Sequence, residues 1–112
     1  MNNNQLLKGT LQTIILRLLQ ENGRLYGYEI TQKVKELSDG EFHLAEGSLY
    51  PALYKLEADG FLETSTEIVD GRVRKYYSLS TDGETKAISS TQEAASFIEK
   101  LQVVLNLKPK LS

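Results

Sequence analysis

The spacing of apolar residues changes from a helical period to a two-residue period at Phe61, and this change limits the fold more than any other feature of the chain. Before Phe61, three segments repeat apolar residues every three or four positions, which predicts three amphipathic helices. After it, residues 61–69 and 72–79 read as strands, and Asp70-Gly71 between them is typical of a two-residue hairpin turn. The chain is therefore predicted to be mainly α with a small β-hairpin.

The three helices are predicted over residues 6–21, 26–37 and 48–57, each with one buried stripe. The stripes are Leu7, Leu11, Ile14, Ile15, Leu18 and Leu19, then Ile30, Val34 and Leu37, then Leu49, Leu53 and Leu56. Asn22-Gly23 should end the first helix, because glycine accepts the left-handed conformation common there. Gly27 should mark the start of the second helix or permit close packing.

Three helices followed by a hairpin predict a winged helix-turn-helix, in which the third helix enters the major groove of duplex DNA. Ser48 is the expected N-cap of that helix, which places Pro51 in its first turn. Its exposed face should carry Ser48, Tyr50, Tyr54 and Lys55, whose polar groups can reach bases or phosphates. Alternatively, Tyr50 and Tyr54 pack in the core with their hydroxyls at its rim.

The charge distribution supports DNA more than the net charge does. The chain carries a net charge of −2, whereas DNA-binding domains are usually basic. However, residues 71–78 of the hairpin, the wing, hold Arg72, Arg74 and Lys75 without an acidic residue. We expect these three cations to contact phosphates and to supply salt-dependent affinity.

Residue types exclude several other functions. The 112 residues suit one domain; they include no cysteine and one histidine, His43, so a metal site or a cysteine nucleophile is not expected. Phosphate-binding glycine motifs are absent, and no catalytic constellation appears, so we expect neither an enzyme nor a cofactor. The chain shows neither a signal-peptide pattern nor an apolar run of about 18 residues, which predicts a cytoplasmic protein without membrane contact.

A last helix is predicted from Ser80 to about Leu107, before Lys108-Pro109, with apolar residues over too wide an arc for one neighbour to cover. A second copy related by a two-fold axis would cover it, so we expect a homodimer that reads a pseudo-palindromic operator. The chain then divides into a DNA-binding domain (1–79) and a dimerisation helix (80–112). An apolar effector is hypothesised between the dimer helices near Leu11, Ile15, Phe97 and Leu101; alternatively these residues form only a dimer core.

Several motifs resemble the PadR family of bacterial transcriptional regulators. They are Tyr26-Gly27-Tyr28-Glu29-Ile30, Gly47-Ser48-Leu49-Tyr50-Pro51 and Arg74-Lys75-Tyr76-Tyr77. The resemblance implies a dimeric repressor of the short-tailed branch, released from DNA by a small aromatic or hydrophobic effector. It also implies that Tyr28, Ser48, Tyr50 and Pro51 face DNA and that Arg74 and Lys75 are the basic pair of the wing. The chain departs from some short-tailed members in lacking tryptophan, and Phe97 could take that place at the effector site.

A second function remains open from the sequence, because winged helices also bind proteins. The acidic isoelectric point of about 5.4 favours a protein-interaction module without DNA binding. The cations of the wing favour DNA.

Overall fold

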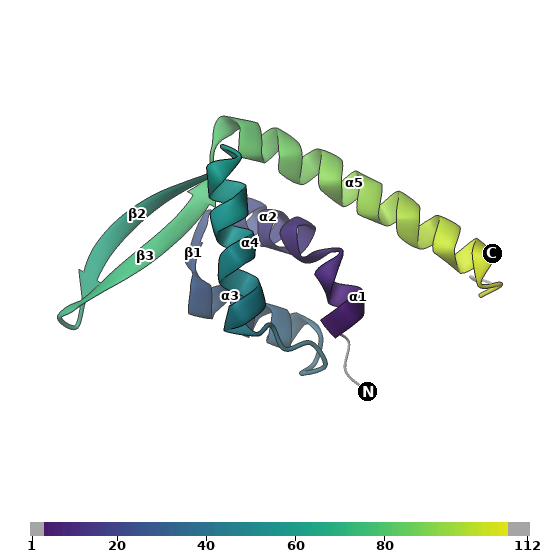
Figure 1. The fold of residues 1–112 in the computed structure, drawn as a ribbon, viewed down its shortest axis with the longest axis horizontal. Helices are drawn as coiled ribbons and strands as arrows, with labels where there is room; N and C mark the ends of the chain where they lie inside the picture. Colours follow the sequence, from purple (N-terminus) through teal and green to yellow (C-terminus); the bar gives the residue numbers. More distant parts are fainter. Residues whose placement is uncertain (1–3, 108–112) are drawn as a thin grey trace.

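The computed structural model describes residues 4–107, and its helical body carries a two-stranded ribbon and a long C-terminal helix (Figure 1). The elements, in chain order, are α1 (Asn4–Lys8), α2 (Leu11–Asn22), β1 (Arg24–Tyr26), α3 (Gly27–Leu37), α4 (Glu46–Ala58), β2 (Leu62–Val69), β3 (Arg72–Leu79) and α5 (Thr81–Val104). The predicted winged helix-turn-helix with an additional C-terminal helix is confirmed. None of the helices within residues 4–107 is long and apolar enough to cross a membrane.

The ribbon follows the predicted hairpin. β2 and β3 pair in antiparallel register from Leu62 opposite Leu79 to Val69 opposite Arg72. Asp70 and Gly71 both have positive φ angles, 51° and 76°, as a two-residue turn of this type requires. The hairpin is thus determined locally, by the two residues that can adopt this backbone conformation.

A third strand, β1, was not predicted. It pairs antiparallel with β3, with Arg24 opposite Ser78 and Tyr26 opposite Tyr76, so the sheet order is β1-β3-β2. Three residues are too few to show an alternating pattern, and only the pairing with β3 makes them a strand. β1 ends at Tyr26, so over residues 72–75 β3 pairs with β2 on one edge only. Within residues 4–107, no strand lies beside its other edge there.

One hydrophobic core joins the three helices, the sheet and the start of α5. The predicted stripes supply most of it, including the whole stripe of α4, Leu49, Leu53 and Leu56. Tyr77 of β3 and Ala87 of α5 complete it. Leu37 was expected in this core but is 73% exposed, at the last residue of α3.

The helix predicted over residues 6–21 is in fact two helices, α1 and α2. The break falls at Gly9-Thr10, where the amide and the hydroxyl of Thr10 both donate to the carbonyl of Leu7 (2.9 and 3.1 Å). These two hydrogen bonds close α1 before α2 begins. The apolar stripe continues across the break, and for this reason the period alone did not reveal it.

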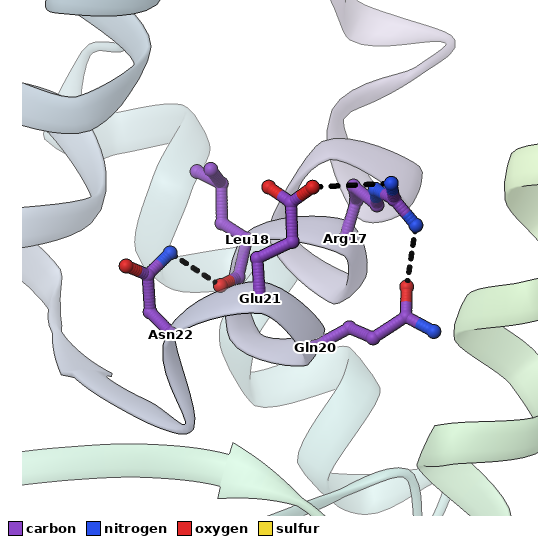
Figure 2. Close-up of polar contacts among 5 residues, drawn as sticks. All are labelled: Arg17, Leu18, Gln20, Glu21 and Asn22. Carbon is purple, nitrogen blue, oxygen red and sulfur yellow. Dashed lines mark hydrogen bonds and ion pairs between the residues drawn. The ribbon is translucent and has the colours of Figure 1, made fainter.

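The predicted end of α2 at Asn22-Gly23 is confirmed. Gly23 has a φ of 84° and its amide donates to the carbonyl of Leu19. Figure 2 shows the last turn, where Asn22 donates to the carbonyl of Leu18 (2.8 Å) and Arg17 pairs with Glu21 (3.1 Å). These contacts hold the end of α2 immediately before β1.

The expected N-cap of α4 is wrong. The helix begins at Glu46, and the carbonyl of the preceding Ala45 accepts from Ser48 and Leu49. Ser48 is therefore an exposed residue within the first turn, and Pro51 lies inside the helix rather than in that turn. Pro51 has no amide hydrogen for the carbonyl of Gly47, but Gly47 is exposed, so solvent can bind this carbonyl.

The last helix, α5, begins as predicted. Ser80 is its N-cap; its hydroxyl accepts from the amide of Gly83 (3.0 Å) and donates to the carbonyl of Gly60 (2.7 Å). The first half of α5 packs on α2, whereas its second half extends away from the other helices (Figure 1). The helix ends at Val104, and the predicted break at Lys108-Pro109 lies outside the described residues.

Candidate nucleic-acid interface

A groove of about 770 Å³ lies between α4, the start of α3 and the ribbon. It runs along the part of β3 that β1 does not cover. Its lining combines tyrosine side chains with the basic residues of the ribbon: Tyr26, Gly27, Tyr50, Tyr54, Val69, Asp70, Arg72, Val73, Arg74, Lys75 and Tyr77. The sequence elements predicted to contact DNA therefore meet at one concave surface.

The predicted DNA-contacting residues fall into two groups. Tyr50 and the three cations of the wing line the groove. The other four, Tyr28, Ser48, Pro51 and Lys55, lie outside its lining as exposed residues of α3 and α4. Lys55 pairs with Asp59 one turn later (2.9 Å). Tyr54, 54% exposed, also lines the groove.

Tyr50 packs closely over Gly27, the first residue of α3. A Cβ atom at position 27 would overlap the Tyr50 hydroxyl and come within 2.7 Å of its Cζ. The Tyr50 ring also packs against the core while its edge reaches the groove. Burial raises the pKa of Tyr50, and the carboxylate of Glu46 raises it further, so Tyr50 is a neutral hydrogen-bonding phenol at neutral pH.

We expect Gly27→Ala to displace Tyr50 and thereby to weaken DNA binding more than folding. The clash is with the far end of a side chain that can rotate, so the free energy of unfolding should change by about 1 kcal/mol or less. Urea unfolding and fluorescence anisotropy with a duplex measure the two effects. In a Tyr50→Ala background, Gly27→Ala should cause no further loss of binding; an equal loss in both backgrounds would contradict the role of Tyr50.

Lys75 lies between the ribbon and α4. Its Nζ is 3.7 Å from a carboxylate oxygen of Glu57 and lies over the rings of Tyr54 (5.6 Å) and Tyr77 (5.3 Å). Because both partners of this ion pair are partly exposed, the pair is worth about 0–1 kcal/mol. A phosphate can therefore replace Glu57 as the partner of Lys75 at little cost.

The two arginines of β3 differ in their surroundings. Arg72 is exposed, whereas the guanidinium of Arg74 lies 4.1 Å from the ring centroid of Tyr26. The neighbouring Tyr76 hydroxyl raises the pKa of Arg74, which stays charged. Among the described residues, no carboxylate lies within 4.0 Å of either guanidinium.

Arg24 and Tyr26 were not identified from the sequence as site residues. Both belong to β1, which the apolar pattern did not reveal, although Tyr26 begins the Tyr26-Gly27-Tyr28-Glu29-Ile30 motif noted in the sequence. Arg24 pairs with Glu67 of β2 (2.7 Å), and this hydrogen bond raises the pKa of Arg24.

Comparison with known proteins decides the functional class of this protein. The family described as "Transcriptional regulator PadR-like family" matches residues 15–88, which run from within α2 to the first part of α5 and include every residue that lines the groove. The chain belongs to the PadR-like family. It is therefore a DNA-binding transcriptional regulator, and the alternative of a protein-interaction module without DNA binding is not favoured.

Individual relatives match over nearly the whole chain. An uncharacterized protein from Lysinibacillus sphaericus is 32% identical over 101 residues, which cover 89% of this chain and 92% of that one. The structure of a transcriptional regulator from Clostridium thermocellum is 28% identical with a TM-score of 0.75, over 95% of this chain and 99% of that chain. A PadR family transcription regulator from Clostridium difficile is 31% identical with a TM-score of 0.69, over 86% and 97% of the two chains.

The four predicted effector residues of this PadR-like protein are not exposed together. Leu11 and Ile15 lie in the core of the subunit, and Ile15 is 0% exposed. Phe97 and Leu101 lie on the second half of α5 and are 62% and 40% exposed. Phe97 and Leu101 are therefore accessible on the surface of α5, whereas the side chain of Ile15 is not accessible in this subunit.

Proposed function

We propose that this PadR-like regulator is a homodimeric repressor that binds a pseudo-palindromic operator and is released by a small apolar effector. The observation that carries the DNA-binding mode is the groove between α4 and the ribbon. Its tyrosines and wing cations are arranged so that α4 can lie in the major groove while the ribbon contacts the adjacent backbone.

The dimer part of the proposal rests on α5. The second half of this helix and its C-cap residue expose apolar side chains at helical spacing, namely Phe97, Ile98, Leu101, Val104 and Leu105. A monomeric protein rarely exposes a continuous apolar stripe of this kind, and a second α5 could cover it. Two α4 helices would then sit about 34 Å apart, one turn of DNA.

Ile98→Lys together with Leu101→Lys is expected to convert the dimer into a folded monomer. Two buried charges would oppose association, and loss of one half-site would weaken operator binding by about tenfold or more. Sedimentation velocity reports the oligomeric state, and circular dichroism reports folding. Gln92→Lys with Ser96→Lys adds the same charge at exposed polar positions of α5 and should leave the dimer intact.

Three further measurements test the proposed function. Selection of bound sites from random duplex DNA should return a pseudo-palindrome, and a reporter gene behind that site should be repressed. Planar aromatic compounds should weaken operator binding in a saturable way if the effector part is right. A wild-type monomer at micromolar concentration, or a wild-type protein that enriches no duplex, would contradict the proposal.

A further inference from the structure

Two arginines and two tyrosines occupy one face of the sheet beside the groove. Arg24 and Tyr26 come from β1, and Arg74 and Tyr76 come from β3. Because Tyr26 lies directly opposite Tyr76, the two rings share a face. Tyr77 and Leu25, which point to the other face, are buried in the core. The face with the two arginines is therefore the outer face of the sheet.

The four side chains are stacked in the order Arg24, Tyr76, Tyr26, Arg74. The guanidinium carbon of Arg24 lies 3.9 Å from the Tyr76 ring centroid. The two rings meet edge to face, with centroids 5.5 Å apart and planes at 85°. The guanidinium carbon of Arg74 lies 4.1 Å from the Tyr26 centroid, well inside the range of about 6 Å for a cation–π contact.

The stack is tied to the rest of the fold at Arg24 and at Tyr26. At one end, Arg24 pairs with Glu67 of β2 at 2.7 Å. Near the other end, Tyr26 directly precedes α3, and its amide donates to a carboxylate oxygen of Glu29 at 3.1 Å. The position of the Tyr26 ring is thus set by the start of α3.

Tyr26 and Arg74 both line the groove, whereas Arg24 and Tyr76 do not. The stack therefore holds one cation, Arg74, at the border of the groove. An arginine side chain loses rotamer entropy when it is held in one conformation. An arginine already held against a ring loses less of this entropy on binding a phosphate.

We propose that Tyr26 is a positioning residue for DNA binding, whose ring holds the guanidinium of Arg74 at the border of the groove for a phosphate. The inference rests on the proposed DNA-binding mode. Arg24, Glu67 and Tyr76 support Tyr26 from the side away from the groove.

A double-mutant cycle between Tyr26→Leu and Arg74→Ala tests this coupling in the full chain. The duplex is the one that site selection returns, and affinity is measured by fluorescence anisotropy at several salt concentrations. Tyr26→Leu should weaken binding roughly two- to fivefold in the wild-type background. It should cause no further loss where Arg74 is already alanine, and Tyr26→Phe, which keeps the ring, should bind like the wild type.

A second pair of variants leaves Tyr26 in place and covers the case in which Tyr26→Leu does not fold. Arg74→Lys keeps the charge but not the planar group that stacks on a ring. It should weaken binding about as much as Tyr26→Leu, with an unchanged dependence on salt. Urea unfolding of Tyr26→Phe and Arg74→Lys should give midpoints close to that of the wild type.

The outcomes separate this inference from the proposed function. Equal losses from Tyr26→Leu in both backgrounds, or no loss from Arg74→Lys, would overturn the positioning role while DNA binding stands. A wild-type protein that binds no duplex with salt-dependent affinity would overturn both.

Discussion

Replacing Arg72, Arg74 and Lys75 together with alanine should weaken binding to every duplex, by roughly tenfold to a hundredfold near physiological salt. The slope of log affinity against log salt should become shallower by about 2.7, because each lost phosphate contact removes about 0.9. Sequence preference should change little, since phosphate contacts carry no base information. Anisotropy titrations over a range of salt concentrations measure both quantities.

The structure supports this expectation because all three cations are available to phosphates. Arg72 is exposed, Arg74 rests on a tyrosine ring at the groove, and Lys75 has only a partly exposed ion pair with Glu57. Coulomb attraction within such an exposed pair is small in water. Binding to DNA therefore need not break a strong internal contact.

A matched triple variant separates contacts from net charge. Alanine at Lys35, Lys86 and Lys100, none of which lines the groove, takes the formal net charge from −2 to −5, as the wing variant does. We expect only a small loss of affinity and a nearly unchanged salt slope. Equal losses from the two triple variants would mean that overall charge, rather than the wing, governs binding.

Gly83→Ala should lower the free energy of unfolding by about 1–3 kcal/mol or more. The added Cβ would overlap the carbonyl oxygen of Phe61 and lie 3.0 Å from its carbonyl carbon. That carbonyl also accepts from the amide of Ser80, at the junction between the sheet and α5. Backbone atoms cannot move aside as a side chain can, so the cost here should exceed that of Gly27→Ala.

Gly47→Ala is the matched control for this variant. Gly47 also lies near the start of a helix, but a Cβ there would meet nothing within 4 Å. Alanine is the better helix former, so the free energy of unfolding should stay constant or rise by up to about 1 kcal/mol. Urea unfolding of both variants compares them directly. If the Gly83→Ala protein is as stable as the Gly47→Ala protein, the backbone at Phe61 can move to make room for the added Cβ, and the prediction is wrong.

Local rules account for the parts of the fold that were predicted correctly. The stripes of α2, α3 and α4 follow from the helical period, and Asp70-Gly71 follows from the positive φ angles that the turn requires. The N-cap of α4 failed because Ser48 has the right chemistry but the helix had already begun at Glu46. Element type was thus easier to predict than element boundary, since a boundary depends on what the neighbouring turn packs against.

The wing cations and Tyr50 could be chosen as site residues from the sequence, because the cations cluster in the predicted hairpin and Tyr50 lies on the predicted third helix. The partners of these residues could not. Gly27 and Tyr50 are more than 20 positions apart, and nothing local indicates that the glycine makes room for the tyrosine. Likewise, β1 has too few residues to show a period, so Arg24 and Tyr26 had no predicted place beside β3.

The sequence alone therefore determined the succession of helices, the hairpin and its basic residues, because each depends on residues within a turn or two of chain. Only the tertiary structure decided that Tyr26 stacks on Arg74, that Arg24 reaches Glu67 and that Gly27 lies under Tyr50. These contacts join residues far apart in the chain, and they form only when the packing of the core brings β1, β3 and α4 together.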